Sequence, residues 1–231
     1  MRALMATFLV VAAAPLAQAR PAARAVGESL SPQLTIAQLQ YGGGGDWYAN
    51  PTGLPNLLRA IKTRTGIAVS DQPAHVKITD LELWQYPYLY MTGHGNVHFS
   101  DQEVQILRQY LGAGGFLHAD DNYGMDRSFR REIQRIFPDA KLVELPQDAA
   151  IYHDFYDFPR GLPKIHKHDG LPAQGFGIFH DGRLVVFYDY QCDLGNGWED
   201  PQTYNDPPAL HEAALRMGVN LFMYAMSQVP R

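Results

Sequence analysis

Short apolar runs alternate with amphipathic segments in the first half of this sequence, and this alternation constrains the fold more than any other feature. The runs at residues 34–41, 86–92 and 116–119 predict strands, and each is followed by a segment with apolar residues at helical spacing. A strand–helix repeat of this kind favours a mostly parallel sheet with helices on both faces. We therefore expect an α/β fold.

Local signals predict where the helices begin and end. Gly66 is expected to end the first helix, which carries leucines on one face from residue 54. Ser100 and Glu103 have the spacing of a capping box, which predicts the start of the second helix. Asp126 is expected to cap a third helix, and Pro138 to end it.

The second half of the chain contains a strong hairpin signal, the pair Asp181-Gly182 between two apolar runs. We expect a strand at 140–145, a long surface insertion at 146–174, a hairpin of strands 175–180 and 183–190, and a last helix that begins at Pro207-Pro208.

The first nineteen residues have the pattern of a secretory signal. Arg2 provides a positive charge, residues 4–16 are largely apolar, and Ala17-Gln18-Ala19 fits a cleavage site. We expect an exposed leader at 20–33 and a single domain at 34–227. The sequence thus predicts a periplasmic or secreted protein with no membrane span after removal of the signal.

Charge and cysteine content exclude several classes of function. Loss of Arg2 with the signal reduces 19 basic residues to 18 against 24 acidic ones, so the net charge changes from −5 to −6. A nucleic-acid groove needs a basic surface, so we expect no nucleic-acid partner. Cys192 is the only cysteine, which excludes an intrachain disulfide and favours a small buried residue over a nucleophile.

Three predicted strands end in turns that combine glycine with polar side chains, at residues 42–46, 93–96 and 120–123. Because parallel strands have their carboxyl ends at one edge of a sheet, these turns are expected to lie together and to form a ligand site. The four glycines of the first turn fit a ligand-binding nest or a flexible turn, but not a P-loop, because no Gly-Lys-Ser/Thr follows.

The turn after the run 116–119 supplies the main catalytic candidates. His118 and Asp120 are two residues apart, so both point to one side of an extended segment, and Asp121 or Asn122 can turn toward the ligand. With His94, they suit either a divalent-cation site or an acid–base pair of carboxylates. The alternative is a polar network that holds the three turns in place. We predict as catalytic residues Asp120, Asp121, His118 and His94.

Further polar and aromatic residues in these turns are candidates for ligand binding. Sugars stack on aromatic rings while amides and carboxylates bind their hydroxyl groups, although single rings are also common in protein cores. The predicted ligand-binding residues are Gly43, Gly44, Asp46, Trp47, Asn96, Asn122 and Tyr123.

Two further segments contain groups that bind metal ions in other proteins. His166 and His168 lie on one face if the chain is extended there, and they suit either a polar lid or a metal site. The segment 193–200 is rich in acid and amide oxygens but lacks the spacing of an EF-hand loop. The sequence identifies neither a cofactor nor a metal.

Three stretches of the chain resemble the bacterial domain of unknown function 4159: Gln40–Tyr48, Met91–Gly95 and Gly115–Gly124. The resemblance extends from about Leu34 to Ala225. It implies a flavodoxin-like fold similar to the class I glutamine amidotransferases, with looser similarity to proteins of the trehalose-utilisation type. The amidotransferase pattern has a cysteine nucleophile on the turn after the central strand. Here that turn carries Asp120 and Asp121, which argues against a cysteine thioester mechanism.

These observations support two main hypotheses about function. The first is an exported hydrolase-like enzyme that acts on a carbohydrate or cell-envelope compound through an Asp/His pocket. The second is a non-catalytic module that binds a glycan or a peptide, and a third is a partner subunit of an envelope assembly. The expected ligand is a small molecule or a glycan, and a protein partner is compatible with the sequence. The fold alone does not choose among these hypotheses.

Overall fold

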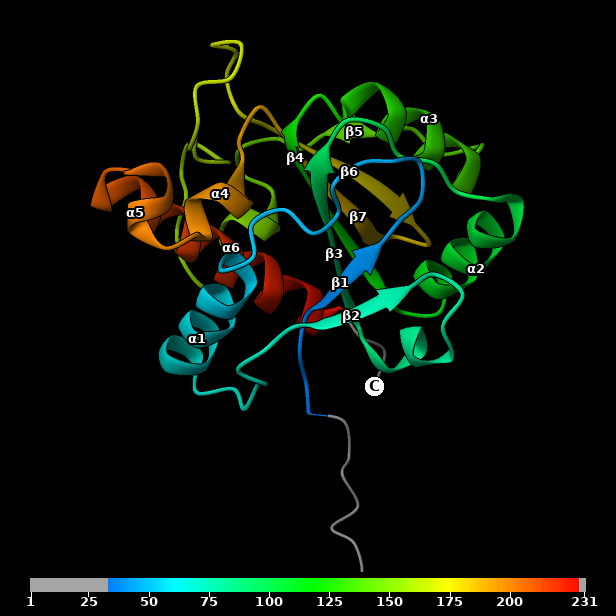
Figure 1. Cartoon of the computed structure of the whole chain (residues 1–231), viewed down its shortest axis with the longest axis horizontal. Coiled ribbons are helices and arrows are strands. Elements are labelled where there is room, and N and C mark those ends of the chain that lie inside the picture. Colours follow the sequence, from blue (N-terminus) through cyan, green and yellow to red (C-terminus); the bar gives the residue numbers. More distant parts are fainter. Residues whose placement is uncertain (1–32, 229–231) are drawn as a thin grey trace, which may run out of the picture. The chain divides into compact units, whose positions relative to one another are not determined.

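A computed structural model describes residues 33–228 of the chain. The predicted signal at 1–19 and nearly all of the predicted leader lie outside the described residues. The described part contains a seven-stranded sheet with the order β2-β1-β3-β4-β7-β6-β5 (Figure 1). None of the helices between residues 33 and 228 is both long enough and apolar enough to cross a bilayer.

Five neighbouring strands of the sheet pair in parallel, and the last two on one side are joined by antiparallel pairing, so that only β6 runs against the others. The parallel strands are β1 (Ala37–Gln40), β2 (Ala74–Lys77), β3 (Tyr88–His94), β4 (Phe116–Tyr123) and β7 (Arg183–Tyr190). The antiparallel strands are β6 (Gln174–His180), which forms the predicted hairpin with β7, and β5 (Val143–Glu144). The predicted α/β class with a hairpin near the C-terminus is confirmed.

Helices cover both faces of the sheet (Figure 1). One face packs against α1 (Gly53–Thr65), α4 (Leu194–Trp198) and α6 (Pro208–Ser227), and the other against α2 (Asp101–Gly112) and α3 (Asp126–Ile136). A short helix, α5 (Pro201–Tyr204), joins α4 to α6, and 3-10 turns occur at η1 (Leu81–Gln85) and η2 (Ala150–Tyr152).

Strand β4 shows how the two cores are built. Phe116 packs in the core on the α1–α6 side, whereas Leu117 and Ala119 pack in the core on the α2–α3 side. Since side chains alternate along a strand, His118 and Asp120 share the side of Phe116 and Asp121 shares that of Leu117. Of the three catalytic candidates on β4, His118 and Asp120 therefore lie beneath α4, and Asp121 lies on the opposite face.

Two predictions of element boundaries near the site are wrong. The polar residues 120–123 belong to β4 itself, because the strand stays paired with β3 through Tyr123. Asp126 is the first residue of α3 and not its cap. The Asp121 carboxylate instead accepts a hydrogen bond from the backbone N–H of Met125, at 2.9 Å.

The predictions for residues 140–174 also need correction. The strand expected at 140–145 is paired only over β5, at the edge of the sheet. The segment 146–174 is not a simple surface insertion, because Ile151, Tyr152 and Ile165 are buried in the core that α6 covers. This packing fixes the part of the segment that carries His166 and His168.

The capping box of α2 is present as predicted, with Ser100 Oγ accepting from Glu103 N–H and the Glu103 carboxylate accepting from Ser100 N–H. Replacing Ser100 by Ala leaves one N–H at the start of α2 without its partner. We expect the free energy of unfolding to fall by about 1 kcal/mol in denaturant titrations. Gln102→Ala in the same turn is the control, with a change within about 0.5 kcal/mol. Equal effects of both substitutions would contradict a specific role for the cap.

Candidate functional site

The segments 42–46, 93–96 and 120–123 lie together at the carboxyl edge of the parallel strands, although the third of them belongs to β4 and is not a turn. The N–H of Gly45 donates to the carbonyl of Asn96 at 3.0 Å, and Asn96 Nδ2 donates to the carbonyl of Gly43 at 3.1 Å. Asn50, just beyond the first turn, donates through Nδ2 to Asn122 Oδ1 at 3.0 Å. These bonds join the segments that follow β1, β3 and β4.

Asp46 and His94 form a pair at the exposed side of this edge. The Asp46 carboxylate accepts from the His94 backbone N–H, and its Oδ2 lies 3.0 Å from His94 Nδ1. Burial acts to raise the pKa of Asp46, but the hydrogen bonds from His94 outweigh it and hold that pKa below its usual range. The pair therefore bridges two turns and has surface access.

The remaining predicted ligand-binding residues are spread along the same edge. Gly43 and Gly44 are exposed, and a Cβ at Gly43 would lie 2.7 Å from the backbone nitrogen of His98, so this turn packs against the backbone of the second one. Trp47 lines a cavity of about 380 Å³ beside Gln38 and His75. Tyr123 is 49% exposed and donates to Asp169 Oδ1 at 2.7 Å.

His118 lies in a fully buried chain of hydrogen bonds. Its Nε2 is 2.6 Å from Asp189 Oδ2, and its Nδ1 is 2.9 Å from the Tyr88 hydroxyl. With the Tyr88 hydroxyl as donor to Nδ1, the neutral ring donates from Nε2 to Asp189. The chain joins β3, β4 and β7 below the surface.

Asp120 ties the centre of the sheet to α4. Its Oδ2 accepts from the Tyr90 hydroxyl and from Gly195 N–H, both at 2.7 Å, and its Oδ1 accepts from Leu194 N–H at 3.1 Å. Asp120 has no exposed surface. A Cβ at Gly195 would lie 2.3 Å from the Tyr90 oxygen and 2.4 Å from Asp120 Oδ2, so only glycine allows the helix to approach this closely.

The protonation of this buried group follows from its lack of solvent. Burial lowers the pKa of His118 to about 4 and raises the pKa of Asp189 to about 8. Burial, together with the adjacent Asp189 carboxyl, also raises the pKa of Asp120 well above its usual range. At neutral pH the imidazole of His118 is therefore neutral, and Asp189 retains a proton.

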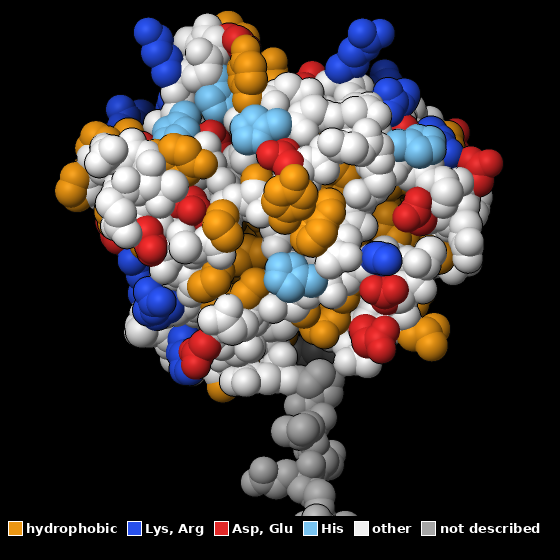
Figure 2. Space-filling view, viewed as in Figure 1, with side chains coloured by type: hydrophobic (Ala, Val, Ile, Leu, Met, Phe, Trp, Pro, Cys, Tyr) orange, Lys and Arg blue, Asp and Glu red, His pale blue; other side chains and the backbone are white. Residues whose placement is uncertain are grey.

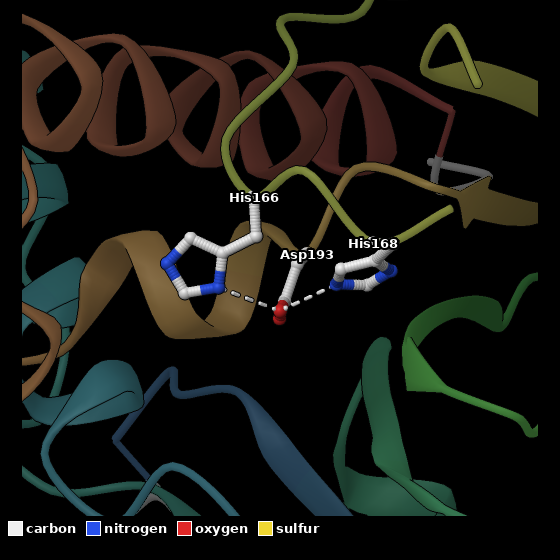
Figure 3. A group of neighbouring side chains, drawn as sticks. All are labelled: His166, His168 and Asp193. Atoms are coloured by element: carbon white, nitrogen blue, oxygen red, sulfur yellow. Dashed lines mark hydrogen bonds and ion pairs between the residues drawn. The ribbon is translucent and has the colours of Figure 1, made fainter. Parts of the chain in front are cut away.

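A second group of polar side chains, which we call the edge cluster, lies where β7 exits the sheet. Asp193 Oδ2 is 3.0 Å from His166 Nδ1 and 2.9 Å from His168 Nε2, and the two imidazoles face this carboxylate from either side (Figure 3). The other nitrogen of His166 lies 3.1 Å from Asp206 Oδ1. The edge cluster consists of His166, His168, Asp193, Asn196 and Asp206.

The edge cluster reaches the surface, unlike the group around His118. The side chain of His166 is 22% exposed and that of Asp206 is 13% exposed. Figure 2 shows several histidine side chains at the surface in the upper part of the molecule, beside acidic and apolar side chains. A ligand can therefore approach this group from solvent.

Buried polar atoms without a partner gather around the same place. Among the described residues, four such atoms belong to this edge: His168 Nδ1, Asp193 Oδ1, Asn196 Oδ1 and Asn122 Nδ2. Unpaired buried polar atoms are rare because each costs about 1–3 kcal/mol. Their concentration here indicates a place that is built to hold something other than protein.

Backbone strain is found at the same edge. Non-glycine residues with positive φ occur in or beside the edge cluster at Asn50, His168, Gln191, Asp193 and Asn205. Each such residue costs on the order of 1 kcal/mol or more, and conformations of this kind concentrate at functional sites. Asp181, in the tight turn between β6 and β7, is the remaining case in the described part of the chain.

Sequence reasoning missed Asp189 and Asp206 as members of a site, and it did not connect Asp193, in the segment 193–200, with His166 and His168. One signal was present, since residues 183–190 form a strand followed at once by the polar segment 191–193. We interpreted that strand only as half of a hairpin. Because β7 also pairs in parallel with β4, its exit lies at the same edge as those of β1, β3 and β4.

The buried carboxyl groups predict an unusual pH dependence of stability. Folded Asp189 keeps its proton up to about pH 8, whereas the unfolded residue loses it near pH 4. The folded state therefore binds more protons in this range, and the free energy of unfolding falls as the pH rises. The depressed pKa of His118 has the opposite effect, but only below its ordinary value of 6.5.

Between pH 6.5 and 8 we therefore expect stability to decrease, by up to about 1.4 kcal/mol per pH unit for one proton. Denaturant titrations across this range measure the slope. Asp189→Asn keeps an acceptor for His118 and removes the charge, so the slope becomes shallower. Asp181→Asn in the exposed turn is the control. A stability that rises with pH in wild type would contradict the assignment.

Comparison with known families agrees with this architecture. The family described as a domain of unknown function (DUF4159) matches residues 35–226. No curated protein matches the sequence. The matched segment contains every strand from β1 to β7, the buried group around Asp120 and the edge cluster. The chain therefore belongs to the DUF4159 family.

Proposed function

We propose that this protein is an exported hydrolase-like enzyme that acts on a carbohydrate or another cell-envelope compound at the edge cluster. One observation carries the proposal: unpaired buried polar atoms and strained non-glycine residues lie together at one solvent-accessible place. Structural polar networks are normally satisfied internally, whereas a site for a ligand leaves groups free to bind it.

The chemistry of the edge cluster suits hydrolysis by water. Two imidazoles each lie within hydrogen-bond distance of the Asp193 carboxylate, and Asp206 orients His166 from the other side of its ring. The hydrogen bond to Asp193 raises the pKa of His166. Imidazole and carboxylate groups promote hydrolysis either as bases or as the ligands of a metal ion. Hydrolysis requires such groups to activate water and to protonate the leaving group.

The surroundings of the edge cluster favour a polyhydroxylated substrate. The ring of Tyr204 lies 5.1 Å from that of His166, and the ring of Tyr123 lies 5.2 Å from that of His168. Asn50 lines the Trp47 cavity, donates to Asn122 and accepts from the Tyr204 hydroxyl, so amide groups lie close to one of these rings. Aromatic faces with nearby amides are the combination that sugars require.

A cysteine mechanism does not suit this arrangement. Burial raises the pKa of the Cys192 thiol well above its usual range, so the thiol stays protonated, and its Sγ donates to the carbonyl of Pro163. As part of the proposal, we infer a fold related to the class I glutamine amidotransferases. The place of their nucleophile would correspond to Asp120–Tyr123, between the central strand β4 and α3.

Within this proposal the four predicted catalytic residues have different roles. Asp120 and His118 position α4, and through it Asp193, because both are sealed below the surface. Asp121 supports the start of α3. His94 is exposed beside Asp46 and remains available to contact a substrate.

The proposal is tested by incubating the purified protein with envelope polysaccharides, their oligosaccharides and acylated sugars, and identifying products by mass spectrometry. We expect hydrolysis of at least one class. His166→Ala should lower kcat/KM by roughly 10²–10⁴-fold, because it removes the imidazole that joins Asp193 to Asp206 in the edge cluster. The exposed His98→Ala is the matched control and should retain activity, as should Cys192→Ser.

Two outcomes would overturn the proposed reaction. If a glycan binds with an affinity that depends on His166 but is never cleaved, the protein is a non-catalytic binding module. If Cys192→Ser removes activity while the melting temperature is unchanged, the nucleophile is the thiol.

A further inference from the structure

We propose that the edge cluster is a binding site for one divalent transition-metal ion, held by His166 Nδ1, His168 Nε2 and the Asp193 carboxylate. The role of this ion rests on the proposed function, since the ion would be the group that activates water. The test of ion binding is nevertheless independent, because metal binding is measured without a substrate.

The donor atoms already converge as metal ligands do. The coordinating atoms of His166, His168 and Asp193 lie within 4.8 Å of one another. The two histidines come from the segment before β6, and Asp193 comes from the turn before α4 (Figure 3). The side chains of Asp193 and His168 are 1% and 8% exposed, so two of the three ligands are held in a rigid, nearly dry setting.

The hydrogen bonds to Asp193 are unevenly distributed over its two oxygens, and a bound ion accounts for this distribution. Asp193 Oδ2 is approached by both imidazoles and by Asn196 Nδ2, while Asp193 Oδ1 has no partner within the described residues. A carboxylate that served only as an acceptor would distribute three donors over both oxygens. Convergence on one point is instead the geometry expected around a bound cation.

His166 Nδ1 also has two conflicting demands. To bond Asp193 Oδ2 at 3.0 Å it must carry a proton, but to accept from Asn196 Nδ2 at 3.2 Å it must not. A metal ion removes the conflict, because the lone pair of Nδ1 then binds the ion.

Asp206 occupies the place of an outer partner for a metal-bound histidine. Its carboxylate lies 3.1–3.2 Å from His166 Nε2, the nitrogen that does not face Asp193. Histidines that bind metals usually donate their second N–H to a carboxylate in this way, which fixes the ring and its tautomer. Asp206 is therefore a positioning residue for the ion and not a ligand.

The donor set indicates the kind of ion. Two imidazole nitrogens and one carboxylate favour zinc and its neighbours among the transition metals, and they disfavour magnesium and calcium, which prefer oxygen ligands. Three protein ligands leave one tetrahedral position for water, the arrangement of catalytic zinc sites. Such an ion lowers the pKa of its bound water, which supplies the nucleophile that the buried Cys192 does not.

Titration calorimetry of the EDTA-treated, dialysed full chain with ZnCl₂ tests the inference, and the visible spectrum with CoCl₂ reports the coordination. We expect one ion per chain and a tetrahedral cobalt spectrum. Asp206→Asn should weaken zinc binding roughly 10–100-fold. His168→Ala should weaken it further, and His98→Ala should leave it unchanged. Zinc should raise the melting temperature of wild type but not of His168→Ala.

If His168→Ala does not fold, His168→Gln replaces it in the same measurements. The ion site is overturned if wild type binds no zinc, if the His168 variant binds zinc like wild type, or if magnesium binds more tightly than zinc. Zinc binding without hydrolysis would overturn the proposed function and support the ion site. Hydrolysis that survives EDTA and the His168 substitution would support the function and overturn the ion site.

Discussion

The hydrogen bonds between the carboxyl group of Asp120 and the start of α4 are the interaction on which the rest of the candidate site depends. This carboxyl group lies in the middle of the sheet and accepts hydrogen bonds from the backbone of Leu194 and Gly195 and from the hydroxyl of Tyr90. A buried carboxyl group is tolerated only when its oxygens are satisfied in this way. The contact holds the start of α4 against β4 and so fixes Asp193, the residue just before the helix.

The polar side chains at this edge form two layers that differ in burial. The lower layer, built from His118, Asp120 and Asp189, is sealed from solvent and joins β3, β4 and β7. The upper layer, the edge cluster, is partly exposed and contains unpaired atoms and strained backbone. A rigid lower layer allows the upper one to keep an unfavourable geometry before any ligand arrives, as preorganised sites require.

The sequence predicted the sheet and the edge at which the site lies, because these follow from local patterns. Apolar runs, the glycine after α1 and the capping box at Ser100 each depend on residues close together in the chain. The direction of parallel strands then determines where Gly42–Asp46 and Gly93–Asn96 meet.

Which polar residues would face solvent could not be predicted from the sequence. The sequence predicts that Asp120 follows a strand, but β4 continues to Tyr123. The carboxyl group of Asp120 therefore lies under α4. That burial depends on Gly195, which is 75 residues further along the chain. The pairing of His166 and His168 with Asp193 likewise depends on β7 lying beside β4, a contact with no local signal.

The central claim is that the upper layer holds a metal ion, and anomalous scattering from crystals grown with zinc tests it most directly. Data collected on both sides of the zinc absorption edge locate the ion without any assumption about activity. The account predicts one peak per chain, in contact with His166, His168 and Asp193, with Asp120 still bound to the start of α4. No peak at this position, or a peak at another group of side chains, would contradict it.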